Sequence, residues 1–155
     1  MKLSRTVLKM VVALSLSLVG APPASAASSP VGTWVKKTES GQPGMTLIIE
    51  EWGPGKAKLT WHVPNQKIVL TLVSKLDGSP APLLIDGNKS SETMAIKLID
   101  KRHTTTTLQM NGKPFGSSKS EFSADYNTMT VENEKPASGT GEKAGKTTEV
   151  WIRSK

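Results

Sequence analysis

The chain has 155 residues, of which 36% are hydrophobic and 21% are charged; these proportions are typical of a folded globular protein and exclude a disordered chain. It contains no cysteine, which excludes disulfide bonds and a lipid-modified N-terminal cysteine. The formal net charge is +7, but its lysines are scattered along the chain, so we expect no nucleic-acid partner.

The N-terminal segment, residues 1–26, is expected to be a signal peptide. Three basic residues precede an apolar run at residues 10–21, and a small-residue "ASA" sequence follows at residues 24–26. The apolar run is too short for a membrane span, which takes roughly 20 residues. We therefore expect export to the periplasm or the extracellular space, and one mature domain at residues 27–155 with no membrane span. Without the three leader cations, 17 basic and 13 acidic residues remain, a net charge of +4.

Short runs of two-residue alternation follow, each bounded by turn residues, and no apolar stripe with a helical period persists. With 13 glycines and 10 prolines, this pattern predicts an all-β antiparallel barrel or sandwich. The expected strands are Val31–Lys37, Met45–Trp52, Lys56–Val63, Lys67–Leu76, Glu92–Asp100, Lys101–Met110, Pro114–Asp125, Thr128–Glu134 and Lys146–Ser154. The expected turns include Leu76–Pro82, Ile85–Asn88 and the Asn111-Gly112 hairpin signal.

The two ends of this region each carry a tryptophan in a short alternating run. Gly32-Thr33-Trp34 resembles the Gly-x-Trp signature of lipocalins and their calycin relatives. The resemblance implies that Trp34 closes one end of a barrel and packs across a basic residue of the last strand, for which Arg153 is the candidate. A guanidinium over an indole face gains roughly 0.5–2 kcal/mol, and pairing the first and last strands removes both sheet edges.

A second resemblance covers most of the region after the leader. The strand junction "IDKRH" at Ile99–His103 and the hairpin "SADYNTMTV" at Ser123–Val131 are similar to those of small exported bacterial lipocalin-like proteins. This resemblance implies a single antiparallel up-and-down β-barrel of roughly 8–10 strands. It implies no catalytic residue.

Catalytic and metal-binding patterns are weak in this sequence. Its two histidines, His62 and His103, lack the spacing of a zinc site, so we expect no metal and no cofactor. No Gly-x-Ser-x-Gly elbow occurs. The adjacent carboxylates Glu50 and Glu51 are expected on opposite faces of a strand, which does not suit a glycosidase pair. We therefore expect a protein that is not an enzyme.

The polar strand at residues 101–110 leaves two orientations open. One places His103, Thr105 and Thr107 inside the barrel, where they would form a polar pocket. The other, which we favour because threonine is common on exposed strand faces, points Leu108 and the alternate threonines inward. The candidate ligand-binding residues are Trp52, Trp61 and Leu70 of the apolar strands and, in the first orientation, His103, Thr105 and Thr107.

The leading functional hypothesis is an exported protein that binds or carries a small, partly apolar or amphipathic molecule in the cell envelope. The alternative is a structural or interaction protein with a filled barrel and no ligand, acting through its surface or through the loop Pro136–Gly145. An enzyme on the same scaffold has the least support.

Overall fold

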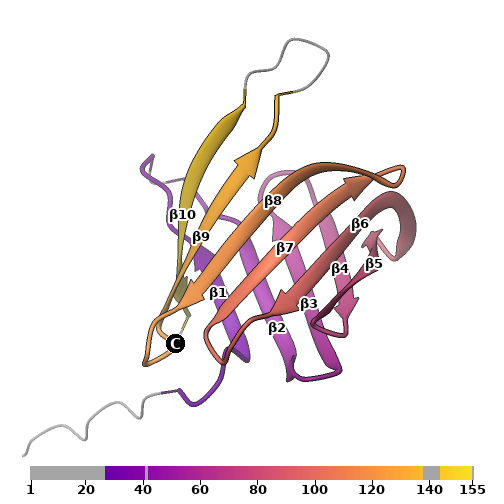
Figure 1. Ribbon diagram of the computed structural model, residues 1–155. Coiled ribbons are helices and arrows are strands. Elements are labelled where there is room, and N and C mark those ends of the chain that lie inside the picture. The colour runs from indigo at the N-terminus through magenta and orange to yellow at the C-terminus, as the bar shows by residue number, and fades with distance from the viewer. Residues whose placement is uncertain (1–26, 41, 138–143, 155) are drawn as a thin grey trace, which may run out of the picture.

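The computed structural model describes residues 27–40, 42–137 and 144–154. The predicted signal peptide and most of the loop Pro136–Gly145 lie outside the described residues. The described part of the chain forms ten β-strands and no helix (Figure 1). The strands are β1 (Gly32–Lys36), β2 (Thr46–Gly53), β3 (Lys56–Val63), β4 (Ile68–Ser74), β5 (Asp77–Ile85), β6 (Asn88–Leu98), β7 (His103–Met110), β8 (Lys113–Phe122), β9 (Thr128–Lys135) and β10 (Gly145–Arg153).

The strands form one closed antiparallel barrel with up-and-down connectivity, which confirms the predicted fold class. Each strand pairs with its neighbours in the sequence, and β1 pairs with β10 to close the sheet. Odd-numbered strands run away from the Trp34 end of the barrel, and even-numbered strands run back toward it. At the other end, β9 and β10 extend past the rest of the barrel (Figure 1). Among the described residues, no helix is long and apolar enough to cross a membrane.

Two of the tight turns follow directly from the sequence. Asn111 and Gly112 join β7 to β8 with φ angles of 52° and 75°. Asp86 and Gly87 join β5 to β6 with φ angles of 48° and 81°. Two consecutive residues with positive φ match the twist of the flanking strands, and Asn-Gly and Asp-Gly adopt this geometry at low cost.

The expected turn at Leu76–Pro82 is wrong for most of its length, because the chain from Asp77 onward forms β5. The chain reverses direction at Lys75 and Leu76, between β4 and β5, and Leu76 has a φ of 58°. Pro80 and Pro82 pair with β6, and the register shifts on both sides of this segment. Proline lacks an N–H for the sheet ladder, and such irregularities let the strand continue past it. A segment whose composition is typical of a turn therefore forms an irregular strand here.

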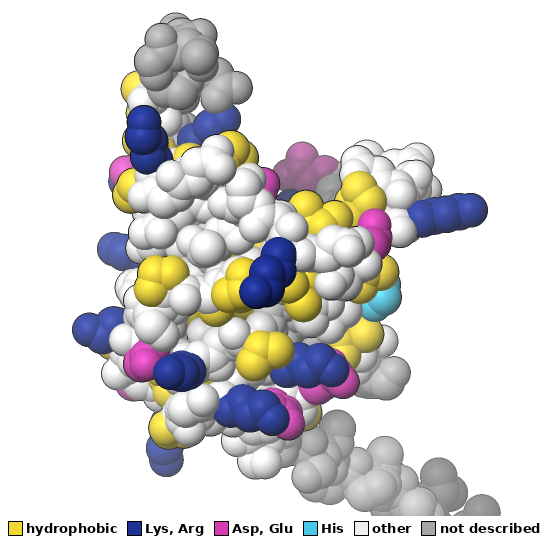
Figure 2. Space-filling model, turned by 90° about the vertical axis from the view of Figure 1, so that its right-hand side faces the viewer, with side chains coloured by type: hydrophobic (Ala, Val, Ile, Leu, Met, Phe, Trp, Pro, Cys, Tyr) yellow, Lys and Arg dark blue, Asp and Glu magenta, His cyan; other side chains and the backbone are white. Residues whose placement is uncertain are grey.

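Alternate side chains of each strand point into the barrel and form one hydrophobic core. The outer surface is mixed. Figure 2 shows the side formed by β4, β5 and β6, where hydrophobic side chains lie in separate groups between lysines and polar atoms. Val73 of β4 is 51% exposed. The buried hydrophobic residues are Trp34, Leu47, Ile49, Ala57, Leu59, Leu72, Leu76, Leu83, Ile96, Phe122, Tyr126, Met129 and Trp151.

Candidate functional site

The barrel encloses a cavity of about 420 Å³. All ten strands contribute to its wall, which is mostly apolar. Pockets that bind small molecules measure roughly 300–1,000 Å³ and are mostly apolar with a few placed polar groups. The cavity therefore has the size and the lining of a small-molecule site. Its apolar lining residues are Met45, Leu47, Ile49, Trp52, Leu59, Trp61, Leu70, Leu83, Met94, Ile96, Leu108, Phe115, Phe122, Met129, Val131 and Trp151.

An aromatic cluster closes one end of this cavity. Trp34 is fully buried and lies next to Phe122, with 5.5 Å between the ring centroids. Phe122 also contacts Trp52, at 5.5 Å with an interplanar angle of 79°, and Tyr126, at 6.0 Å. Edge-on and tilted contacts of this kind are the favoured geometries of aromatic pairs. The cluster forms the floor of the barrel.

Arg153 covers the outside of this floor. Its guanidinium carbon lies 4.8 Å from the centre of the Trp34 ring, within the range of a cation–π interaction. Its N–H groups donate to the backbone carbonyls of Ser29, Val31 and Tyr126. Partial burial lowers the pKa of Arg153 below its usual value. The structure thus places the residues proposed for closure, Trp34 and Arg153, against each other.

Gly32 is required at this seam for two reasons. Its φ is 143°, in the region that residues with side chains rarely adopt. A Cβ atom at this position would also lie 2.5 Å from Nη1 of Arg153. Any side chain at residue 32 would therefore displace the arginine from the carbonyls that hold it.

The charged groups of the cavity lie toward the opposite, open end. Lys36 at the end of β1 forms an ion pair with Glu149 of β10, with 2.6 Å between Nζ and Oε1. The indole N–H of Trp151 donates to the other carboxylate oxygen of Glu149 at 3.3 Å. The side chains of Lys36 and Glu149 are 32% and 25% exposed, so solvent reaches them. Glu92 of β6 and Asn133 of β9 also line the cavity.

β7, which contains most of the polar strand at residues 101–110, has the orientation that we favoured. Thr104, Thr106 and Leu108 of β7 line the cavity. The intervening residues His103, Thr105 and Thr107 do not, so their assignment as ligand-binding residues is corrected. The physical reason is strand alternation, since successive side chains of β7 point to opposite faces of the sheet. Of the candidates proposed from the sequence, the cavity brings together Trp52, Trp61 and Leu70.

Glu50 and Glu51 also differ from expectation, because both are exposed on the outside of the barrel. A β-bulge shifts the register between Ile49 and Glu51. The bulge adds one residue to β2 and so breaks the alternation at this point. Glu50 pairs with Lys58 at 2.8 Å, and Glu51 pairs with Lys56 at 2.9 Å. The same shift turns Trp52 into the cavity.

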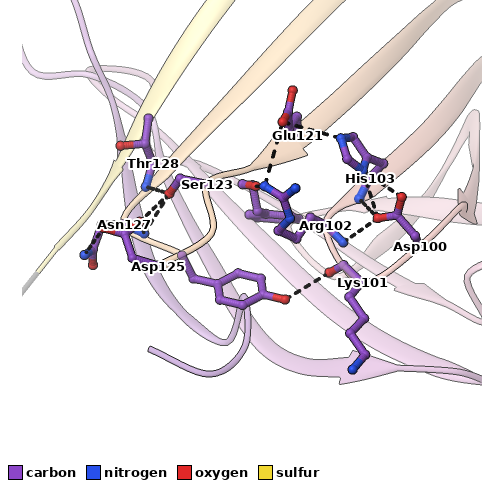
Figure 3. A network of polar contacts seen from close by, with 11 residues as sticks. Asp100, Lys101, Arg102, His103, Glu121, Ser123, Asp125, Asn127 and Thr128 are labelled. Carbon is purple, nitrogen blue, oxygen red and sulfur yellow. Dashed lines mark hydrogen bonds and ion pairs between the residues drawn. The ribbon is translucent and has the colours of Figure 1, made fainter. Parts of the chain in front are cut away.

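His103 belongs to a polar network outside the closed end (Figure 3). Its Nδ1 lies 2.8 Å from the carboxylate of Asp100, and its Nε2 lies 3.5 Å from Glu121 of β8. The hydroxyl of Tyr126 donates to the backbone carbonyl of Lys101 at 3.2 Å. These contacts join the β6–β7 loop to β8 and to the β8–β9 turn. No group of three or more potential metal ligands lies together in the described part of the chain.

The β8–β9 turn is built around a carboxylate, Asp125. The Ser123 hydroxyl donates to it at 2.6 Å, and the backbone and side-chain amides of Asn127 donate at 3.1 and 2.9 Å (Figure 3). These hydrogen bonds lower the pKa of Asp125 from 3.8 to about 2. The pKa of Asp100 is also lowered, first by the backbone N–H of Arg102 and then by the His103 side chain.

These lowered pKa values predict a loss of stability in acid. A carboxylate whose pKa is depressed in the folded state stabilises the fold above its unfolded pKa, and this contribution is lost as the pH falls through the folded value. Asp125→Asn should therefore lower the urea midpoint at pH 7, and its difference from the wild type should shrink between about pH 4 and pH 2. Glu132→Gln, at an exposed position of β9, is the control. An Asp125→Asn difference that is equal at both ends of this range would contradict the assignment.

The polar residues of the open end are the part of the site that sequence reasoning missed. Glu92 lies two and four residues before Met94 and Ile96 and so shares the apolar face predicted for this strand. Lys36 lies two residues after Trp34 and shares its face. Extending each apolar face by two residues would have found both. The pairing of Lys36 with Glu149 needs the register of β1 against β10, which the sequence does not provide.

The fold and the cavity together define an antiparallel up-and-down β-barrel with a hollow interior, consistent with a calycin-like fold. No protein-family model matches this sequence, and no curated protein matches it significantly. The assignment to this class therefore rests on the structure of the chain itself.

Proposed function

We propose that the protein is an exported, lipocalin-like carrier that binds a small amphipathic molecule inside its barrel, in the bacterial cell envelope, without catalysing a reaction. The observation that supports binding is the cavity of about 420 Å³, with an aromatic floor at one end and charged groups at the other. Support for export comes from the sequence pattern of residues 1–26 and from the resemblance to exported lipocalin-like proteins.

The cavity also bears on the alternative of a filled barrel without a ligand. A packed interior leaves few voids larger than a water molecule, because protein interiors reach the packing density of organic crystals. The space in this barrel exceeds such voids and falls within the range of small-molecule pockets. It therefore favours a binding protein over a purely structural one.

A fluorescence titration tests this function. Trp52, Trp61 and Trp151 line the cavity, so a bound neutral probe such as N-phenylnaphthylamine should quench their emission by energy transfer. We expect saturable binding with one probe per protein. Solvent extraction of the purified protein followed by mass spectrometry should then reveal any co-purified ligand. Failure of the neutral probe and of charged apolar probes to bind saturably would overturn the carrier function.

A further inference from the structure

The positive and negative charges of the ionisable groups that line the cavity do not cancel. Among the residues that the structure describes, the cavity wall contains one cation, Lys36, and two anions, Glu92 and Glu149. Lys36 and Glu149 neutralise each other across the β1–β10 seam at 2.6 Å. Glu92 has no side-chain hydrogen bond or ion pair with any other residue that the structure describes. Within the described part of the cavity wall, the Glu92 carboxylate is therefore left without an opposite charge.

Glu92 is placed to meet the polar end of a molecule in the cavity. It lies near the start of β6, which runs from the open end toward the floor, and it is partly buried. Met94 and Ile96, the next residues on the same face, continue the cavity wall downward. An apolar group bound beside these side chains would extend from the Glu92 carboxylate toward the aromatic floor.

The cost of desolvation decides which polar group suits this position. A ligand that covers Glu92 removes water from a carboxylate, and this is unfavourable unless a new partner replaces the water. A neutral head group compensates in part, an anionic one adds repulsion, and an ammonium group supplies an opposite charge. Trp61 lies on β3 near the same end, and its ring offers a second favourable surface for a cation.

Lys36, the one cation among the described residues of the cavity wall, is a poor receptor for an anionic head group. Nζ of Lys36 is engaged by Glu149, whose second oxygen accepts from Trp151. An anion at Lys36 would have to share the ammonium group with Glu149 and would be repelled by that carboxylate. The ion pair at the open end thus disfavours binding of an anion, whereas the Glu92 carboxylate offers a position for a cation.

We propose that the ligand is a cationic amphiphile, with an alkyl or aryl chain in the barrel and an amine or quaternary ammonium group against Glu92. This inference rests on the proposed carrier function and specifies its ligand class.

The test compares three probes of equal chain length, decyltrimethylammonium, decanol and decyl sulfate, as competitors of N-phenylnaphthylamine. The two ionic probes are used below their micelle concentrations and decanol below its solubility limit. We expect decyltrimethylammonium to bind about tenfold more tightly than decanol, with decyl sulfate the weakest. In Glu92→Gln this cation preference should disappear, while decanol keeps its affinity. Glu132→Gln removes an exposed carboxylate from the outer face of β9 and should leave the preference intact.

The possible results distinguish a failure of the proposed ligand class from a failure of the proposed carrier function. Equal affinities for the three probes, or tighter binding of decyl sulfate, would overturn the ligand class while the carrier function stands. A cation preference that survives Glu92→Gln would overturn the role of Glu92. Absence of saturable binding by the naphthylamine and by all three probes would overturn the carrier function itself. Because the wild type alone discriminates the probes, the comparison holds even if one variant folds poorly.

Discussion

Replacing Trp34 with alanine is expected to lower the free energy of unfolding by about 3–5 kcal/mol, the usual cost of removing a large aromatic side chain from a core. Trp34 is fully buried, and its removal would strip the floor of its contact with Phe122 and of the ring beneath Arg153. It would also abolish the hydrogen bond from the indole N–H to the carbonyl of Pro30. Urea denaturation followed by circular dichroism measures the change.

The neighbouring residue supplies the matched control for this substitution. Val35 lies on the same strand with its side chain on the outside, where it is 38% exposed. Val35→Ala should change the unfolding free energy by less than about 1 kcal/mol, as surface substitutions usually do. A Trp34→Ala cost no larger than that of Val35→Ala would contradict the role of Trp34 as the floor of the barrel.

The second large effect is expected on binding. Thr106→Phe would place a phenyl ring in the cavity, because Thr106 is 7% exposed and its side chain lines the interior. We expect the Kd of N-phenylnaphthylamine to rise at least about a hundredfold, a loss of about 2.7 kcal/mol of binding energy. The unfolding free energy should change far less than the binding, since the added ring enters existing space rather than a packed region.

The adjacent residue again provides the control, because Thr107 lies on the opposite face of β7. Thr107→Phe adds the same ring outside the barrel and should leave the Kd within about twofold of the wild type. The comparison separates a blocked cavity from a general effect of a bulky residue on β7. Equal binding by the two variants would show that the probe does not occupy the barrel interior.

The closure of the barrel was predictable from the resemblance of Gly32-Thr33-Trp34 to the lipocalin signature, which implies that the tryptophan packs against a basic residue of the last strand. A Gly-x-Trp opening and an arginine in the last strand identify the seam, and the structure pairs Trp34 with Arg153 in the sheet register. The Asn111-Gly112 hairpin was predictable because few residue pairs adopt positive φ twice in succession. The hairpin signal is local and needs no knowledge of the rest of the fold, whereas the pairing of Trp34 with Arg153 joins the first and last strands of the sheet.

The incorrect predictions occurred where the two faces of a strand carry the same residue type, or where a bulge changes which residues of a strand face inward. Four consecutive threonines, Thr104–Thr107, place the same residue type on both faces of β7, so composition alone does not show which face is buried. The bulge in β2 places Glu50 and Glu51 on the same side, although simple alternation separates them. Ion pairs between strands, such as Lys36 with Glu149, depend on the register of closure, which only the assembled barrel defines.

Closure of the barrel also affects the order in which the strands pair during folding. Nine of its ten strand pairings join strands adjacent in the sequence, whereas the β1–β10 seam joins groups as far apart as Val31 and Arg153, 122 residues away along the chain. Bringing such distant segments together carries the largest loop-closure entropy of any pairing in the fold. The open sheet has no enclosed volume, and its Lys36 and Glu149 lie at opposite edges. The cavity therefore exists only in the completed barrel, and any molecule that bound inside it would favour the closed barrel over every intermediate in which β10 has not docked.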